Sequence, residues 1–160
     1  MRRVNGLATT LSRAKGGQFV THVKSMPGNP YDGHTLATVI PQMEALVGNT
    51  LDRILADKGY RGHNAPPDHK FRVFISGQKR GVTPSIKRQL RRRSAVEPVI
   101  GHLKAEHRMN RNYLWFRRGD AANAILAAVG YNFRRLIHWL RLLLCQILVA
   151  LMATRKPAPA

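Results

Sequence analysis

Acidic residues and cysteine are the scarce residue types in this chain of 160 residues. A single cysteine, Cys145, excludes an internal disulfide framework and any cysteine-rich zinc site. Any carboxylate chemistry must come from eight acids: Asp32, Glu44, Asp52, Asp57, Asp68, Glu97, Glu106 and Asp120. The opening residues also lack the charged and apolar regions of a secretory leader, so we expect a cytoplasmic protein.

Basic residues dominate the charge. The chain has 27 Lys and Arg against 8 Asp and Glu, a formal net charge of +19. Such a chain attracts polyanions, which means DNA, RNA or anionic lipid. The one strongly apolar stretch, residues 142–153, is interrupted by Gln146 and is shorter than the roughly 20 residues of a membrane helix. We therefore expect a buried helix there and no membrane partner.

The order of the segments predicts an α/β fold in which helices pack on a mixed sheet. Residues 1–16 have no clear period and are predicted to be a basic arm or a remnant of a longer chain. Strands are expected at 18–24, 53–56 and 71–75, and a helix from His34 with Asp32 as its N-cap and Gly48 as its stop. A long helical pattern at 119–153 precedes a disordered tail, 154–160.

Asp57 is the first acid of interest because it ends a predicted strand. Open α/β sheets bind ligands beyond the carboxyl ends of their strands, where a carboxylate can hold a hard cation such as Mg²⁺. The alternative is a structural turn in which Asp57 bonds to the backbone of Lys58 and Gly59. Considered alone, this short segment favours the turn.

Glu97 is the only acid between Asp68 and Glu106, and it lies in a segment, 87–104, that contains six Lys or Arg. One acid in such a basic element suggests metal chemistry at a phosphate. Alternatively, Ser94 and Glu97 form an S-x-x-E capping box at a helix start. If a helix instead runs through this region, Arg93, Glu97 and Lys104 lie on one face, and Pro98 must be accommodated as a kink.

Other residues favour structural interpretations. We expect the histidines at 63, 69, 102 and 107 on solvated or DNA-facing surface rather than around zinc. The aromatic cluster of Tyr113, Trp115 and Phe116 could stack on bases beside Arg117 and Arg118, but such clusters are more often part of a core.

Two separated motifs resemble those of DDE transposases encoded by bacterial insertion sequences. The hexapeptide DKGYRG at 57–62 resembles the segment around their second catalytic aspartate, and Arg93-3-Glu97-6-Lys104 matches the end of their Tyr-2-Arg-3-Glu-6-Lys signature. Leu90 stands where that signature has tyrosine. The resemblance extends over roughly residues 16–144, including GNPYDGHTL and RRRSAVEPVIGHLKAEHRM.

The resemblance implies a ribonuclease H-like fold whose two aspartates and one glutamate hold two divalent ions, Mg²⁺ or Mn²⁺, for DNA strand cleavage and transfer. Asp57 and Glu97 would be the catalytic metal ligands, and Arg93 and Lys104 would contact the DNA backbone or these ligands. The basic cluster of Lys87, Arg91 and Arg92 is also expected to bind DNA.

The first aspartate of the family belongs on an earlier strand, and none of Asp32, Glu44 and Asp52 resembles it. We therefore expect a catalytically incomplete transposase: a partial ribonuclease H-like domain at 17–118 that lacks its first strand region, followed by a helical extension at 119–153. Its partners would be transposon-end and target DNA, and its own copies or full-length transposase. One competing hypothesis is a non-catalytic basic nucleic-acid-binding protein, and another is an anionic-membrane binder that uses residues 139–152.

Overall fold

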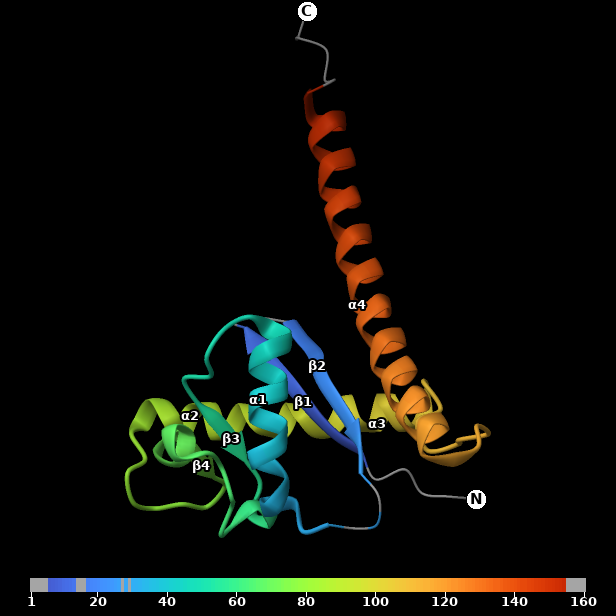
Figure 1. Ribbon diagram of the computed structural model, residues 1–160. Coiled ribbons are helices and arrows are strands. Elements are labelled where there is room, and N and C mark those ends of the chain that lie inside the picture. Colours follow the sequence, from blue (N-terminus) through green and yellow to red (C-terminus); the bar gives the residue numbers. More distant parts are fainter. Residues whose placement is uncertain (1–5, 14–16, 27, 29, 155–160) are drawn as a thin grey trace, which may run out of the picture.

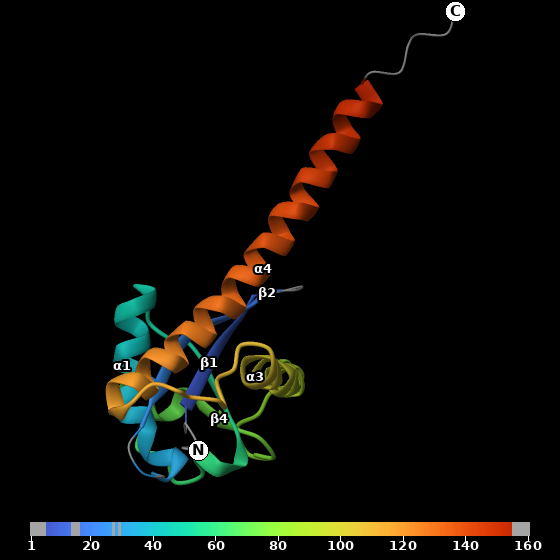
Figure 2. The ribbon, with the colours of Figure 1, turned by 90° about the vertical axis from the view of Figure 1, so that its right-hand side faces the viewer.

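The strands form the middle layer of a three-layer body. The computed structural model describes residues 6–13, 17–26, 28 and 30–154. Helix α1 (Leu36–Val47) lies on one side of the strands, and the run of α2 (Pro84–Arg92) and α3 (Val96–Ala105) lies on the other (Figures 1 and 2). Helix α4 (Phe116–Thr154) starts beside the strands and then extends far beyond the body (Figures 1 and 2).

An antiparallel hairpin opens the described chain. Strand β1 (Gly6–Arg13) pairs with β2 (Gly17–Ser25), with a register shift between Thr9 and Thr10. The expected strand at 18–24 is confirmed as β2. The segment expected to be a basic arm or a remnant of a longer chain, 1–16, contains β1 at 6–13, while 1–5 and 14–16 lie outside the described residues. Pairing with β2 satisfies the backbone of β1, so this strand needs no clear hydrophobic period in its own sequence.

A second, parallel pair carries the first motif. Strand β3 (Ile54–Ala56) pairs with β4 (Val73–Ile75), which confirms both expected strands with shorter bounds. Each pair is a separate two-stranded sheet among the described residues, so they do not form the single mixed sheet that was expected. Two-stranded sheets are marginal alone. Here the helices on both sides of the strand layer supply the packing.

Helix α1 ends as predicted but begins differently. Gly48 has φ +72° and donates its N–H to the Glu44 carbonyl, a left-handed helix stop that favours glycine. The predicted N-cap role of Asp32 is wrong because Asp32 opens a 3₁₀ turn, Asp32–Thr35, ahead of α1. The Thr35 hydroxyl donates to the Asp32 carbonyl, and the Asp32 carboxylate is directed elsewhere.

An asparagine of α4 closes the edge of β2. The side chain of Asn132 accepts a hydrogen bond from the Val20 N–H at 2.9 Å and donates to the Val20 carbonyl at 2.8 Å. One amide thus replaces the two bonds that a neighbouring strand would make. Phe19 and Trp139 add an edge-to-face ring contact at 5.0 Å. These contacts fix α4 against the hairpin as far along the helix as Trp139.

The buried apolar residues form two clusters. The first joins β2, α3 and α4, and comprises Val20, Val99, Leu103, Met109, Ala127, Ala128 and Tyr131. The second joins α1 to the parallel strands, and comprises Leu36, Ile40, Met43, Leu51, Ala56 and Val73. Small alanines in the first cluster allow α4 to approach the hairpin closely.

The helical run α2–α3 is continuous, joined by the 3₁₀ turn Arg93–Ala95. The predicted capping box is wrong: the Ser94 hydroxyl donates to the Arg91 carbonyl, and Ala95 precedes α3 without a side-chain cap. Pro98 lies in the first turn of α3, directly after the 3₁₀ turn, where the α-helical pattern of hydrogen bonds is already interrupted.

Helix α4 extends the predicted 119–153 helix by a few residues, to Phe116–Thr154, and 155–160 lie outside the described residues. The expectation that residues 142–153 are buried is wrong. None of the most apolar 18-residue window of α4 is buried, and by length and composition alone this one helix could cross a membrane.

Candidate nucleic-acid and metal site

Asp57 comes directly after β3, at the carboxyl end of the parallel pair. Its Oδ1 accepts the N–H of Lys58 at 2.6 Å, and its carbonyl accepts the N–H of Tyr60 at 3.1 Å. The residue therefore caps the 3₁₀ turn Lys58–Tyr60, as the turn interpretation predicted. Because 56% of its side chain remains exposed, the carboxylate can also contact a ligand.

Arg93 connects the two sequence motifs. Its Nη2 lies 3.2 Å from Oδ1 of Asp57, and only 19% of the Arg93 side chain is exposed. Arg93 belongs to the 3₁₀ turn between α2 and α3, so this ion pair attaches the helical run to the end of β3. The motif at 57–62 and the Arg-3-Glu-6-Lys motif are therefore neighbours in space.

Glu97 lies one helical turn beyond Arg93, in the first turn of α3. Glu97 is exposed and makes no ion pair with any described residue. Asp57 and Glu97 thus flank Arg93, one through a direct contact and the other along the helix.

Tyr60 and Asp32 adjoin this site, which sequence reasoning missed. Burial raises the pKa of Tyr60 to about 12, and the charge of Asp32 and more weakly that of Asp57 add to the effect, while Arg93 opposes it. The Asp32 Oδ2 would lie 3.2 Å from a Cβ on residue 59, so Gly59 leaves room for this carboxylate. The sequence signal for the approach of Asp32 was Gly59, the glycine two residues after Asp57.

The described residues contain no preformed site with three metal ligands. Among the described residues, no three His, Cys, Asp or Glu side chains converge on a point that could hold a metal ion. Mg²⁺ in proteins is commonly held by one or two carboxylates together with phosphate oxygens and water. Asp57 and Glu97 are the two carboxylates that the motifs offer for such an ion, and both side chains are accessible to solvent.

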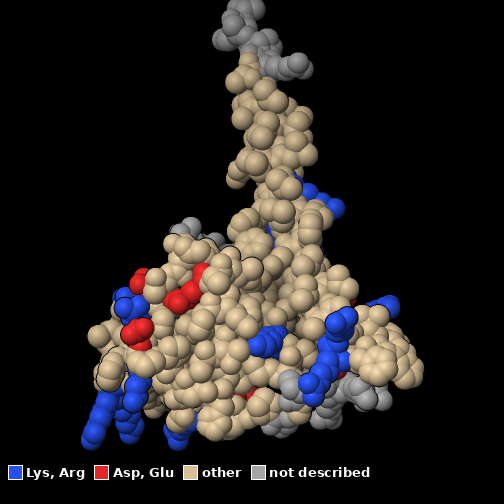
Figure 3. All heavy atoms as spheres, in the orientation of Figure 1, with Lys and Arg blue, Asp and Glu red and all other residues tan. Residues whose placement is uncertain are grey.

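The exposed cations of α2 share one face, which we call the basic face: Lys87, Arg88, Arg91 and Arg92. At about 100° per residue they span an arc of roughly 140°, opposite buried Ile86 and inward-facing Arg93. Like charges at i and i+4 repel, and phosphates relieve that repulsion. Lys104 is exposed further along, in α3. Figure 3 shows Lys and Arg side chains projecting from the body.

The aromatic cluster before α4 is exposed, so its predicted core role is wrong. Exposed fractions are 76% for Tyr113, 82% for Trp115 and 75% for Phe116. Phe116 also has φ +64°, a left-handed conformation that costs a non-glycine residue about 1–3 kcal/mol. Beside the arginines at 117 and 118, these rings provide surfaces on which bases can stack.

Two histidines differ from expectation. The ring of His107 packs edge-to-face on Tyr131, and its Nε2 is buried. His69 is buried, and its Nε2 lies 2.8 Å from Oε1 of Glu44. The same carboxylate oxygen accepts the Leu51 N–H at 2.7 Å, a bond that holds the pKa of Glu44 below its usual value. His69 therefore supports the α1 core and does not face DNA. The only sequence signal for the contact with Glu44 was the scarcity of acids, which leaves His69 few possible carboxylate partners.

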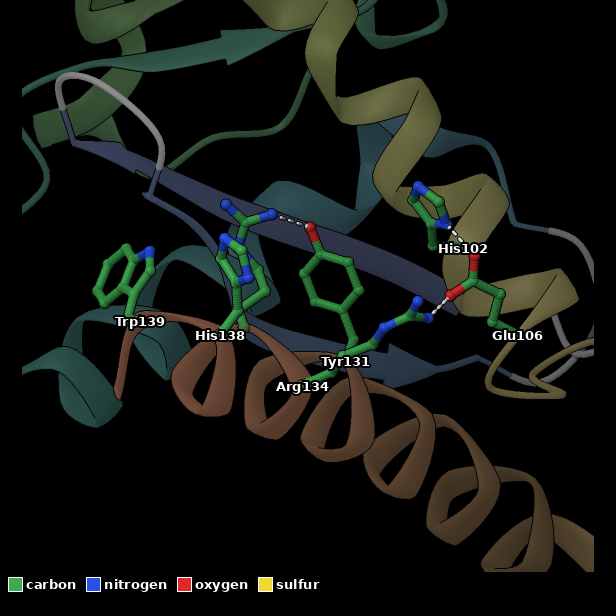
Figure 4. A pocket seen from close by; sticks show the side chains of 7 residues that line it. His102, Glu106, Tyr131, Arg134, His138 and Trp139 are labelled. Carbon is green, nitrogen blue, oxygen red and sulfur yellow. Dashed lines mark hydrogen bonds and ion pairs between the residues drawn. The ribbon is translucent and has the colours of Figure 1, made fainter. Parts of the chain in front are cut away.

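A cavity of about 360 Å³ lies between the end of α3 and α4 (Figure 4). Glu106 projects into it and contacts both His102, at 2.6 Å, and Arg134. On the same wall, Arg135 donates to the Tyr131 hydroxyl at 3.3 Å. Because Glu106 already bonds to both His102 and Arg134, we assign the cavity a structural role that fastens α3 to α4.

The chain matches no protein-family model, no curated protein and no solved structure. Its function therefore has to follow from its own residues.

Proposed function

We propose that this protein derives from a DDE transposase of a bacterial insertion sequence. In this proposal it binds DNA through the basic face and holds one divalent cation between Asp57 and Glu97, without a complete two-metal site. The observation that carries the proposal is the 3.2 Å ion pair between Arg93 and Asp57. It brings together the two motifs on which the resemblance to that family depends.

Two features support DNA as the ligand. The basic face presents four exposed cations with no acid in α2, and the exposed aromatic rings near Arg117 and Arg118 add stacking surfaces. Lys104 lies on the same helical run as Glu97, where it can contact a phosphate next to the carboxylate. Such a protein is expected in the cytoplasm, associated with the nucleoid.

The arrangement of these residues explains how a DNA phosphate would be positioned better than it explains how a strand would be cleaved. Arg93 holds the Asp57 carboxylate in place and contributes positive charge next to the position expected for a DNA phosphate. A divalent cation would supply charge stabilisation to the oxygens of that phosphate. Because no three of the described acids and histidines converge on a point, we expect the chain alone to bind DNA without cutting it. Its own copies or a full-length transposase are the proposed partners, either of which could supply a further carboxylate.

A second candidate function is non-catalytic nucleic-acid binding. The specific observation in its favour is that Arg93 already neutralises one of the two candidate metal ligands. Both functions predict DNA binding with a steep salt dependence. Only the transposase-derived site predicts a divalent ion that depends on Asp57 and Glu97.

DNA binding is tested by fluorescence anisotropy with a labelled duplex over a series of salt concentrations. Each phosphate contact contributes about one unit to the slope of log affinity against log salt, so Lys87→Gln, Arg91→Gln and Arg92→Gln should each lower it by about one. Arg141→Gln removes the same charge from the distal half of α4 and should leave the slope unchanged. Equal effects at all four positions would contradict a role for the basic face.

Cleavage is tested on the same duplex with an end label and added Mg²⁺ or Mn²⁺. The proposal predicts intact strands after prolonged incubation with the purified chain. Nicking that Asp57→Asn abolishes would show that the site is complete, contrary to the proposal.

A further inference from the structure

The distal part of α4 exposes an apolar surface that the body does not cover (Figures 1 and 2). Large side chains from Leu136 to Met152 have exposed fractions between 42% and 69%. Figure 3 shows few Lys or Arg side chains along this part of the molecule. Monomeric proteins rarely expose a continuous apolar surface of this extent, so it indicates an interaction site.

The spacing of the apolar residues indicates what covers them. One stripe of them recurs at alternating intervals of three and four, through Leu126, Val129, Phe133, Leu136, Leu140, Leu143 and Ile147, all of them exposed, while further exposed apolar residues such as Leu144 and Leu148 lie outside it. We call these seven residues the α4 seam. A repeat of 3.5 residues keeps one stripe of a helix facing a partner helix, as in a coiled coil.

A polar stripe runs along the same helix with the same period. Arg134, His138 and Arg141 are exposed and follow intervals of four and three, and the small side chain of Cys145 comes next. Leu148 and Met152 follow at the same intervals, so the stripe is polar only as far as Arg141. At about 100° per residue, this stripe lies well to one side of the α4 seam. A helix that pairs with another helix keeps such a stripe in water, whereas a lipid bilayer would have to cover Arg141.

The body leaves the α4 seam accessible. Ala124, Ala127, Ala128 and Tyr131 are buried and face the hairpin, and they lie on a different side of the helix from Leu126 and Val129, which are exposed. The seam therefore begins where α4 still packs on the body and continues beyond it. A partner helix can pack along it without displacing Asn132 from Val20.

We propose that α4 pairs with α4 of a second copy of this chain through the α4 seam. A helix with a matching heptad repeat of exposed apolar residues is the partner that such a seam fits, and the chain itself carries one. The distal half of α4 has Arg141 as its single charged residue as far as Thr154, so two copies can approach there despite their high net charge. This assembly does not depend on DNA binding or on the metal site.

Sedimentation equilibrium of the full chain in lipid-free buffer with high salt tests the pairing. The wild-type chain should have at least twice the mass of one chain at tens of micromolar. Leu140→Lys or Leu143→Lys, each within the seam, should shift it to single chains with at least a tenfold weaker association. Cys145→Lys adds the same charge in line with the polar stripe and should keep the assembly.

Leu140 and Leu143 are exposed in the single chain, so the variants at these positions should retain the helical circular dichroism and the unfolding temperature of the body. A wild-type chain that sediments as single chains would overturn the proposal, and so would seam variants that keep the wild-type mass. Flotation with vesicles that contain anionic lipid tests whether a membrane covers this surface instead. A chain that stays single without lipid and floats with vesicles would assign the surface to a membrane.

Discussion

The guanidinium of Arg93 lies 3.2 Å from the carboxylate of Asp57, where the end of a parallel strand meets a 3₁₀ turn between two helices. The contact has two consequences. It fixes the helical run α2–α3 against the β3–β4 sheet, and it places a positive charge next to the carboxylate that we propose as a cation ligand. Any metal at Asp57 must share this carboxylate with Arg93 or displace it.

Replacing Arg93 should therefore separate metal binding from DNA binding. Arg93→Gln removes the competing charge, and partly exposed ion pairs of this type contribute up to about 1 kcal/mol, so the Mn²⁺ affinity should rise by about two- to fivefold. DNA affinity should fall at the same time. Isothermal titration with Mn²⁺ and anisotropy with duplex DNA measure the two effects. A loss of both affinities would mean that Arg93 maintains the site.

Glu44 should make the fold sensitive to acid. The Leu51 N–H, His69 and Arg72 hold the pKa of Glu44 below its usual 4.5, while burial acts in the opposite direction. A carboxyl group whose pKa is lowered by folding stabilises the protein above its unfolded pKa, and this contribution is lost as the pH falls through the folded value. Glu44→Gln should lower the unfolding temperature at pH 7, and the difference from wild type should shrink below pH 4.5. A difference independent of pH would contradict a contribution from the charge.

Two helical glycines should respond in opposite directions to alanine. At Gly119 a Cβ would lie 2.6 Å from the Leu114 Cβ and 2.8 Å from its carbonyl carbon, so Gly119→Ala should cost about 1–3 kcal/mol. At Gly101 nothing lies within 4 Å, so Gly101→Ala should stabilise α3 by about 0.5–1 kcal/mol. Urea unfolding measures both. Equal effects would mean that the turn before α4 is not packed as described.

The attachment of α4 to the hairpin should depend on the side-chain amide of Asn132. Asn132→Asp removes the donor to the Val20 carbonyl and places a carboxylate oxygen against it, so it should destabilise the chain by about 1–3 kcal/mol. Asn49→Asp makes the same change at an exposed position after α1 and serves as the control. If both variants unfold at the same urea concentration, α4 is held by its apolar contacts alone.

Local signals in the sequence predicted most of the elements. Gly48 marked the end of α1, and the strand at 54–56 was evident from its apolar run and from Asp57 after it. β1 was missed because its pairing with β2 is a long-range property of backbone groups, and the residues at 6–13 show no alternation strong enough to reveal it.

The site was predictable in its residues and not in its arrangement. Asp57 and Arg93 followed from their motifs, but their contact depends on how the turn Arg93–Ala95 orients the helical run. Asp32 was assigned to a helix cap because it precedes α1, and its position next to Gly59 arises only when two distant turns pack together. His69 and the aromatic residues at 113–116 were misassigned for the same reason: burial depends on tertiary packing.

The most direct test of the central claim is Mn²⁺ binding followed by broadening of backbone amide resonances in the full chain. One ion between Asp57 and Glu97 should broaden the amides of Lys58 and Val96 first, at low Mn²⁺ concentration. Asp57→Asn and Glu97→Gln should each abolish this selective broadening, while Asp68→Asn, at another exposed acid, should preserve it. Broadening that is unchanged in the first two variants would contradict the assignment of this site.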